Sequence, residues 1–379
     1  MKVVHVTSVH TPFDVRIFRK MCRSCADAGW DVVLVAPHSA SGTFDGLTVK
    51  AVPVRKSRLA RALLTSCQAV RAALRERPDI MHFHDPELMP WAWLLAMRGR
   101  KVIFDMHENL PAAILSKTWI PRAVRRVLSS IWYRLEKLML GRVAVIFAEN
   151  SYRARYPGLT RHETILNMPI VDALTGICAR KHAEWSVGYV GSVAPQRGSI
   201  ITLEALALLQ RAGLRLRYEC IGAASASHMD ELRATVNRLG LDNVVFAGAL
   251  PAKEAWTRLA RCHVGLAVLQ PVPNYLESYP TKLFEYMALG LPVVVSDFPL
   301  YRTIVEGAKA GICVDSTDPR AIAQALRWIA EHAAEGAQMG RNGLEAVRRS
   351  YGWAQEEKKL LAFYRTVFAG TASSTAVRP

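Results

Sequence analysis

Two charged side chains interrupt an otherwise apolar helix pattern in residues 278–295, and their positions favour binding of an anionic ligand. Pro280 and Thr281 suit the start of a helix, where a missing N–H costs nothing and a side-chain oxygen can cap free amides. Lys282 and Glu285 follow within the first turns. Because the amino end of a helix attracts anions, a phosphate would meet Lys282 while Glu285 accepts hydrogen bonds from hydroxyl groups. The alternative is a solvated helix face with an ion pair three residues apart.

The run PTKLFEYMALGLPVVVS begins at Pro280, and Glu277 lies eight residues before Glu285. This pattern resembles the donor-binding signature of GT4-type glycosyltransferases, the retaining sugar transferases of the GT-B fold. In that family the first glutamate of the pair lies near the donor sugar, and the second holds the ribose hydroxyls of the nucleotide. The resemblance therefore implies a catalytic place for Glu277 and donor binding by Lys282, Leu283 and Glu285.

A second segment, GYVGSVAPQRGSI at residues 188–200, begins in the strand-like run 187–190. It resembles the diphosphate loop of the same family, where small residues let backbone amides approach the phosphates and a basic residue neutralises charge. A further glycine follows the strand-like run 217–221. The residues that this resemblance implies for the donor are Gly191, Ser192, Arg197 and Gly222.

Polar residues also follow the predicted strands of the first half, at the edge where ligands bind in open α/β sheets. The loop HTPFDVRIF, residues 10–18, resembles a His-x-x-x-Asp-x-Arg-Ile-Phe form of the same branch; its alternative is a structural ion pair and cap. The strand-like runs 80–83 and 101–104 end in His84-Asp85 and in Asp-x-His-Glu. Candidates for the acceptor side of the cleft are His10, Asp14, Arg16, Asp85 and Glu108.

The Asp-x-His-Glu segment resembles the family position at which a histidine sits beside the donor sugar. His107 is therefore the first choice for a polar group at the reacting centre, and a buried structural histidine is the alternative. His82 and His84 share a strand face, but two histidines without a further ligand set do not make a zinc site. No Asp-x-Asp pair occurs to hold a metal on the diphosphate, so neither metal nor cofactor is expected.

The chain of 379 residues has a formal net charge of +17, concentrated in residues 1–180 with 27 basic against 14 acidic side chains. Nucleic acid, an anionic membrane and a diphosphate substrate are the partners that such a charge attracts. Within residues 114–142, basic residues alternate with large apolar ones, among them Trp119 and Trp132. A basic amphipathic helix of this kind is typical of an anionic membrane surface. The alternative is an apolar stripe packed on the sheet beneath solvated arginines.

The sequence lacks a secretory signal and any run of eighteen apolar residues, and its seven scattered cysteines are typical of reduced thiols. We therefore expect a cytoplasmic protein, peripheral on the inner face of a bacterial membrane. A lone Cys22-x-x-Cys25 lies in a helical pattern and reads as helix packing rather than as a metal or redox site.

Alternating strand and helix patterns on both sides of a loose segment at 167–184 predict an α/β protein. The family resemblance implies the GT-B architecture, two Rossmann-like domains facing across a cleft. The expected divisions are an acceptor-side domain at 1–170, with a helix at about 354–369 packing back on it, a donor domain at 171–353 and a disordered tail at 370–379.

The implied reaction is transfer of a sugar from a nucleotide diphosphate to a hydroxyl group, with retention at the anomeric carbon. The basic helix favours a lipid-linked saccharide of bacterial surface polysaccharide assembly as acceptor. A nucleotide-sugar 2-epimerase, which has the same two-domain plan, is the alternative enzyme. A nucleic-acid-binding protein is disfavoured, because the arginines alternate with large aliphatic residues rather than with exposed aromatic ones.

Overall fold

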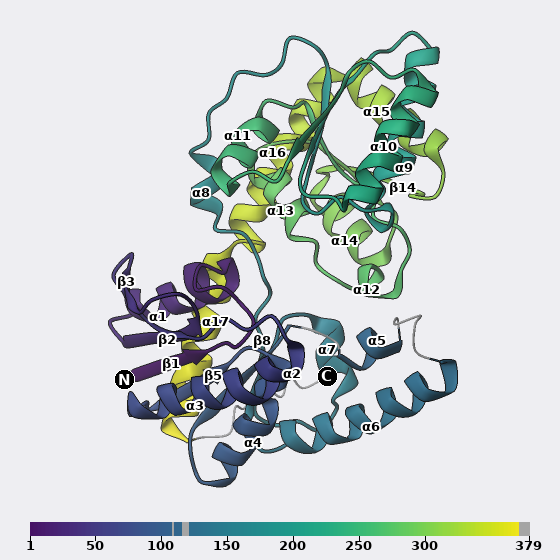
Figure 1. Ribbon diagram of the computed structural model, residues 1–379. Helices are drawn as coiled ribbons and strands as arrows, with labels where there is room; N and C mark the ends of the chain where they lie inside the picture. The colour runs from purple at the N-terminus through teal and green to yellow at the C-terminus, as the bar shows by residue number, and fades with distance from the viewer. Residues whose placement is uncertain (108–109, 116–120, 371–379) are drawn as a thin grey trace. The chain divides into compact units, whose positions relative to one another are not determined.

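The computed structural model describes residues 1–107, 110–115 and 121–370, and these form two compact units. Unit 1 comprises Met1–Asn167 together with the chain from Ala354, and unit 2 comprises Met168–Trp353 (Figure 1). The change of unit comes three residues before the boundary expected after residue 170. No helix in the described part of the chain is long and apolar enough to cross a membrane.

Unit 1 is built on a sheet with the strand order β3-β4-β2-β1-β5-β6-β7-β8. Only the β3–β4 pair is antiparallel; the other neighbours are parallel. Apart from β3, the order follows the doubly wound pattern, in which ligands bind beyond the carboxyl ends of the strands near β1 and β5. The strands are β1 (Lys2–Val6), β2 (Asp31–Pro37), β3 (Gly42–Phe44), β4 (Leu47–Val52), β5 (Ile80–Phe83), β6 (Val102–Met106), β7 (Ala144–Phe147) and β8 (His162–Thr164).

Helices cover both faces of this sheet. Val4 and Val6 of β1 pack into a core with residues of α3, α4 and α6, whereas His5 points to the opposite face, where it meets Tyr364 of α17. The helical elements are η1 (Val15–Cys22, π-helical), α1 (Arg23–Asp27), α2 (Arg58–Ala60), η2 (Arg61–Thr65, π-helical), α3 (Ser66–Arg75), η3 (Pro86–Leu88), α4 (Met89–Met97), α5 (Leu110–Leu115), α6 (Arg122–Leu140), α7 (Asn150–Arg155) and α17 (Trp353–Ala369).

Helix α17 closes unit 1 from the far end of the chain. Its Glu356 accepts from the amide of Leu166 at 2.8 Å, and Tyr364 is fully buried against the sheet. The Cys-x-x-Cys pair, Cys22 and Cys25, is buried in the neighbouring helical segment η1–α1. Apolar packing of a distant segment thus completes the core beneath the first strands.

Unit 2 is a parallel sheet in the order β11-β10-β9-β12-β13-β14. This is the Rossmann order, and it reverses between β9 and β12. Val293, Val294 and Val295 are fully buried, as expected for a central parallel strand with both faces covered. The strands are β9 (Ser186–Val190), β10 (Arg217–Ile221), β11 (Val244–Gly248), β12 (Val264–Ala267), β13 (Val293–Ser296) and β14 (Gly311–Val314).

The helices of unit 2 connect these strands and place the loops that follow them at one edge of the sheet. They are α8 (Val171–Thr175), η4 (Pro195–Arg197), α9 (Ser199–Arg211), α10 (Ala226–Leu239), α11 (Ala252–Ala260), α12 (Pro273–Leu276), α13 (Thr281–Ala288), α14 (Pro299–Ala308), α15 (Pro319–Glu331) and α16 (Ala333–Ser350). Helix α13 starts where the sequence pattern predicts, but its first turn has no side-chain cap: Pro280 is the N-cap residue, so Thr281 does not cap it.

Candidate active site

Two glycines bring the loops after β9 and β10 into close contact in unit 2. Gly191 has φ +128° and Gly222 has φ +154°, backbone conformations that side chains rarely adopt. A Cβ on Gly222 would lie 1.7 Å from the carbonyl oxygen of Gly191. A Cβ on Gly191 would meet Lys282 Nζ at 3.3 Å. The loop after β9 therefore lies against the start of α13, where glycine leaves room beside the lysine.

Lys282 is a buried lysine whose amine donates to an aromatic oxygen, and the negative charge of Glu285 also acts on it. Its Nζ donates to Tyr189 Oη at 2.8 Å and lies 4.2 Å from the centre of that ring. Burial, reinforced by the positive charge of Arg197, lowers the pKa of Lys282 to about 7. Only 8% of the residue is exposed, so the solvated helix face of the alternative interpretation is wrong for Lys282.

Arg197 lies in η4, directly after the glycine loop. Burial alone would lower its pKa, but Tyr275 and Tyr189 beside the guanidinium raise it. The guanidinium carbon lies 5.8 Å from the centre of the Tyr275 ring. Ser192 is exposed, and its carbonyl accepts from Tyr189 Oη at 2.6 Å. Two basic side chains and one loop carbonyl thus gather around Tyr189.

The remaining candidates of unit 2 differ in exposure. Leu283 is fully buried and its amide donates to the Pro280 carbonyl at 2.9 Å, which favours a packing role. Glu285 is half-buried in α13, and Glu277 is exposed at the C-cap of α12. The structure therefore leaves both carboxylates accessible from outside the core.

In unit 1, Asp85 follows β5, and its carboxylate holds the turn that follows β1. One carboxylate oxygen, Oδ2, accepts from Thr7 Oγ1 at 2.8 Å and from the Ser8 amide at 2.6 Å. The side chain is 1% exposed, and Oδ1 faces His10 Nε2 at 3.4 Å. These hydrogen bonds fix the orientation of the carboxylate.

Arg16 is buried behind this turn and pairs with Asp105. The contact is bidentate, with Nε to Oδ2 at 2.9 Å and Nη2 to Oδ1 at 2.7 Å, and Nη2 also donates to the carbonyl of Ile165. Burial would raise the pKa of Asp105, but the Arg16 guanidinium holds it well below its usual range. Arg16 thus forms a structural ion pair in the interior of unit 1, which is the alternative stated for the loop at residues 10–18.

His10, Asp14 and His107 lie together at the carboxyl edge of the sheet. His10 Nε2 is 3.2 Å from His107 Nε2, and its Nδ1 is 3.5 Å from Asp14 Oδ2. Burial opposes ionisation of Asp14, but hydrogen bonds from His10 and from the Ile17 amide lower its pKa to about 2. Glu108, the remaining candidate of this half, lies outside the described residues.

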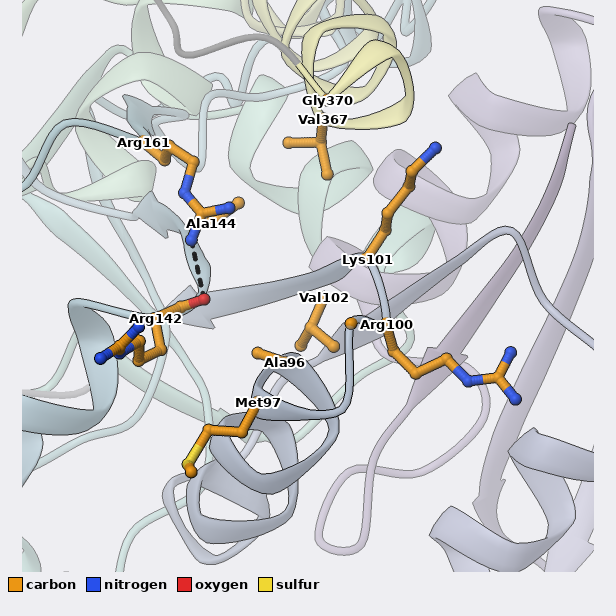
Figure 2. A pocket seen from close by; sticks show the side chains of 11 residues that line it. Ala96, Met97, Arg100, Lys101, Val102, Arg142, Ala144, Arg161, Val367 and Gly370 are labelled. Carbon is orange, nitrogen blue, oxygen red and sulfur yellow. Dashed lines mark hydrogen bonds between the residues drawn. The ribbon is translucent and has the colours of Figure 1, made fainter.

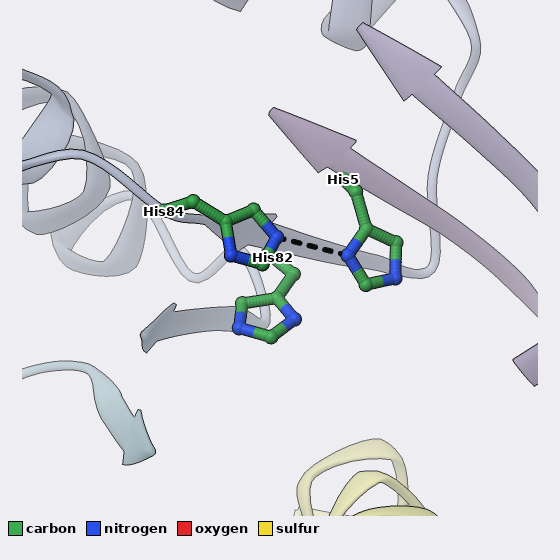
Figure 3. Close-up of side chains that lie close together, drawn as sticks. All are labelled: His5, His82 and His84. Atoms are coloured by element: carbon green, nitrogen blue, oxygen red, sulfur yellow. Dashed lines mark hydrogen bonds between the residues drawn. The ribbon is translucent and has the colours of Figure 1, made fainter. Parts of the chain in front are cut away.

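Three further histidines, His5, His82 and His84, lie close together, as Figure 3 shows, and all three are fully buried. His5 Nδ1 is 3.0 Å from His84 Nε2, and Tyr364 Oη lies 2.6 Å from His82 Nδ1. Burial lowers the pKa of all three imidazoles, so they are neutral at pH 7. Their network ties β1 and β5 to α17.

A pocket of about 290 Å³ lies at the amino ends of β6, β7 and β8, the edge opposite to His10. Basic residues line part of it, but in Figure 2 the side chains of Arg100, Lys101 and Arg142 point in different directions. Arg161 donates to the carbonyl of Arg142 at 2.8 Å. The pocket is therefore not an assembled anion site.

Helix α6 carries an apolar stripe that the sheet does not cover. Residues at helical spacing along it are 44–62% exposed: Val124, Val127, Leu128, Ile131, Leu135 and Leu138. The covered face is instead formed by Ser129, Glu136, Met139 and Leu140. The alternative in which this stripe packs on the sheet is therefore wrong; Trp119 of the same sequence segment lies outside the described residues.

Sequence reasoning missed several residues of these clusters. Tyr189, which receives the lysine hydrogen bond, lay inside the predicted strand, and Tyr275 was not singled out within its loop. Thr7 holds Asp85 through a contact across 78 residues. The sequence did contain a signal for them: polar or aromatic residues at the carboxyl ends of predicted strands, where ligands bind in open α/β sheets.

Two family models match successive parts of this chain. "Glycosyl transferase 4-like domain" matches residues 15–156, and "Glycosyl transferases group 1" matches residues 178–346. The chain is a GT4-type glycosyltransferase. The D-inositol 3-phosphate glycosyltransferase of Segniliparus rotundus is 26% identical over 94% of this chain and 81% of its own length. The phosphatidyl-myo-inositol mannosyltransferase of Mycobacterium leprae is 25% identical over 76% of this chain and 74% of its own.

A solved structure shares the fold of this glycosyltransferase. Anabaena HepE in complex with UDP-glucose has 15% sequence identity and a TM-score of 0.73, covering 97% of this chain and 100% of its own. The two Rossmann-like units therefore form the expected GT-B fold.

Proposed function

We propose that this glycosyltransferase transfers a sugar, with retention, from a nucleotide diphosphate donor to a hydroxyl group of a lipid-linked saccharide. The donor would bind to unit 2, at the loop after β9 and the start of α13. The proposed setting is bacterial surface polysaccharide assembly, with the enzyme cytoplasmic and peripheral on the inner face of the membrane.

The observation that carries the donor assignment is the buried cation Lys282. A buried charge is costly unless a counterion or ligand balances it. Lys282 donates to the neutral Tyr189 Oη, and burial together with the charge of Arg197 outweighs the opposing effect of Glu285 on its pKa. A diphosphate would supply two negative charges here. No side chain caps the first turn of α13, and the positive amino end of a helix favours an anion.

The same groups would also lower the barrier of the reaction. Charge accumulates on the diphosphate as it leaves the sugar, and fixed cations stabilise that charge without reorganisation. We assign this role to Arg197 and Lys282, assign the ribose hydroxyls to Glu285, and place the sugar with His107 and Glu277. No metal is required on the diphosphate in this mechanism.

The acceptor side of the proposal rests on α6. Its exposed apolar stripe is accompanied by exposed basic residues, namely Arg122, Arg126, Arg134 and Lys137. A helix with these two features binds the interface of an anionic bilayer, with the apolar residues in the headgroup region. One of the relatives is named for a phosphatidylinositol acceptor, which supports a lipid-linked substrate for this chain as well.

A thermal-shift screen tests the donor site. UDP, GDP, ADP, dTDP, CMP and their common sugar conjugates are added to the native chain, to Glu285→Ala, to Arg197→Ala and to the control Arg211→Ala at the end of α9. A ligand at about 100 times its Kd stabilises the folded state by about 2.7 kcal/mol. We expect one nucleotide to stabilise the native chain and the control, and the two site variants to lose the effect.

A screen in which no nucleotide stabilises the native chain would overturn the donor assignment. Once the nucleotide is known, its sugar conjugate is incubated without acceptor and the products are separated. Conversion to a different sugar nucleotide would identify the 2-epimerase instead of the transferase, whereas transfer to an added lipid-linked saccharide is the expected result.

A further inference from the structure

Three polar side chains of unit 2 form a hydrogen-bond chain between the starts of α9 and α10. Ser199 Oγ lies 2.8 Å from His228 Nε2, and His228 Nδ1 lies 2.7 Å from Glu231 Oε2. Ser199 and His228 are 6% and 7% exposed, whereas the side chain of Glu231 is 58% exposed. The carboxylate therefore lies at the surface, and the serine hydroxyl is the inner end of the chain.

The carboxylate decides which nitrogen of His228 carries the proton when the ring is neutral. An ionised carboxylate accepts hydrogen bonds and cannot donate one, so the proton of the neutral ring lies on Nδ1, facing Glu231. Nε2 is then an acceptor, and the Ser199 hydroxyl donates to it. The chain thus has one direction, from Ser199 through His228 to Glu231.

The starts of the two helices place these side chains. Gly198, the N-cap residue of α9, has no side chain to cap the helix, and Ser199 follows it as the first helical residue. In α10, the N-cap residue is Ser225, whose Oγ accepts from the His228 amide at 3.3 Å. His228 therefore lies in the first turn of α10, with Glu231 three residues later on the same face.

The inner end of the chain lies close in sequence to Arg197, the basic residue assigned to the diphosphate. Arg197 is the last residue of η4, and Ser199 follows two residues later. On the other side of Arg197, the carbonyl of Gln196 accepts from the Gln270 amide at 2.9 Å. Backbone contacts before Arg197 and the bond of Ser199 to His228 after it therefore hold the segment that carries the guanidinium.

We propose that Ser199, His228 and Glu231 are positioning residues for donor binding, which act by holding Arg197 where it meets the diphosphate. This inference rests on the proposed function, because the diphosphate is the ligand assigned to Arg197. A binding group displaced by about 1 Å can lower the rate of a reaction by about 100-fold, so the support behind such a group affects function.

The polar character of the chain favours positioning over simple packing. Two apolar side chains would join the helices without the desolvation cost of a buried hydroxyl and imidazole. Hydrogen bonds, unlike apolar contacts, fix a direction as well as a distance. Serine hydrolases use the same order of groups with the serine as nucleophile, but the burial of both Ser199 and His228 favours a supporting role.

The hydrogen-bond chain is tested first without nucleotide. Protein with 15N-labelled histidine is studied by NMR at about pH 9, well above the ordinary pKa of an imidazole. His228→Gln assigns the ring signals by their absence. We expect a proton on Nδ1 of His228, and both Ser199→Ala and Glu231→Ala should shift its signals. A proton on Nε2 would overturn the proposal, because the ring would then lack a proton to donate to Glu231.

Nucleotide affinity is measured next by calorimetry, with UDP, GDP, ADP and dTDP each titrated into the native chain and the variants. Ser199→Ala removes a single oxygen. We expect it to raise the Kd of the nucleotide that binds the native chain by about tenfold, as loss of one hydrogen bond would. Glu231→Ala should act in the same direction. Asp230→Ala, the neighbouring position in α10 with a side chain 76% exposed, is the control and should bind as the native chain does.

Conservative variants separate the hydrogen bonds from packing. Ser199→Thr retains the hydroxyl group, and His228→Gln retains an acceptor close to the position of Nε2. Both should recover most of the affinity, whereas His228→Ala should not. Melting temperatures check that each variant is folded. Binding by Ser199→Ala as tight as that of the native chain would overturn the proposal.

Action through Arg197 predicts that the two changes are not additive. Arg197→Lys keeps the positive charge but loses the planar guanidinium, so adding Ser199→Ala to it should change the Kd by less than about twofold. An equal effect of Ser199→Ala in both backgrounds would overturn the proposal. If none of the four nucleotides binds the native chain, in which the hydrogen-bond chain is intact, the proposed function fails and the positioning role fails with it.

Discussion

Lys282 donates its hydrogen bond to Tyr189 Oη at 2.8 Å, and the pair spans 93 residues of unit 2 to join the first turn of α13 to the last part of β9. The lysine is buried and its pKa is lowered to about 7, first by burial and then by Arg197. A group with this pKa is half protonated under ordinary conditions. An anionic ligand that binds beside Lys282 would therefore stabilise the protonated amine, which takes up a proton from solution.

Donor affinity should fall as the pH rises above 7. A bound diphosphate favours the ammonium form, so its binding raises the pKa of Lys282 and takes up a proton from solution. The apparent Kd for the sugar nucleotide should increase by up to about tenfold for each pH unit from 7 until the pKa of the complex is reached. Calorimetry in buffers of different ionisation enthalpy measures both the Kd and the proton uptake.

Lys282→Arg is the matched variant, because a guanidinium stays protonated over this range. It should bind with little dependence on pH between 7 and 9. In the protein without donor, the low pKa of Lys282 instead predicts how the free energy of unfolding changes with pH. Between pH 7 and about 10.5 the unfolded chain binds more protons at Lys282 than the folded one, so this residue makes the free energy of unfolding rise with pH. A donor affinity independent of pH in the native chain would contradict the assignment.

Gly222→Ala should disrupt the donor loop. The new Cβ would lie 1.7 Å from the backbone oxygen of Gly191, at a φ of +154° that alanine rarely adopts. Both loops must move, so we expect a loss of stability of about 1–3 kcal/mol and a large loss of nucleotide-induced stabilisation. Gly307→Ala in α14 is the control, because nothing lies within 4 Å of its Cβ and its φ is not positive. Equal melting temperatures and nucleotide shifts in the two variants would refute this account.

Asp105→Asn should destabilise unit 1 much more than the same substitution on the surface. It leaves the Arg16 guanidinium buried with its bidentate partner neutralised, which typically costs about 3–5 kcal/mol. Asp242→Asn is the control: it removes an ion pair with Arg215 whose side chains are 68% and 57% exposed, worth about 0–1 kcal/mol. Urea unfolding of both variants gives the two values, and similar values would show that the buried pair is not needed.

The alternation of strands and helices was predictable because buried parallel strands are short apolar runs. The run 217–221 becomes β10 with those bounds, and Val293–Ser296 becomes β13. The antiparallel strand β3, Gly42–Phe44, was missed, since its three residues contain a glycine and its stability comes from pairing with Leu47–Val52. Strand β14, Gly311–Val314, has only four residues and depends on its pairing with β13.

Contacts between residues that follow different strands of the sheet could not be predicted from the sequence. The polar residues at strand ends were foreseeable, but the approach of His10 to His107 spans 97 residues, and that of Arg16 to Asp105 spans 89. Which of these residues come into contact depends on the order of the strands in the sheet, and the spacing of apolar residues does not predict that order. Likewise the pattern of α6 indicated an apolar stripe but not which face the sheet would cover, because helical spacing alone cannot distinguish a packed stripe from an exposed one.

Binding of α6 to an anionic membrane should depend on both its apolar stripe and its charge. Native protein should float with vesicles that contain an anionic phospholipid at moderate salt, and high salt should weaken the binding by screening. Val127→Asp with Ile131→Asp should abolish flotation, because the two side chains are 58% and 49% exposed and lie one turn apart on the stripe. Their exposure means that folding is preserved, which the melting temperature checks.

Charge reversal separates the electrostatic contribution to this binding. Arg126→Glu with Arg134→Glu changes the charge of α6 by four, and Arg211→Glu with Arg320→Glu makes the same change in unit 2. Each basic residue near an anionic surface contributes about 1 kcal/mol, so the α6 variant should lose binding by more than tenfold while the control loses little. Equal losses would mean that net charge alone recruits the protein. Flotation that survives both the apolar and the charge variants of α6 would move the membrane contact to another surface.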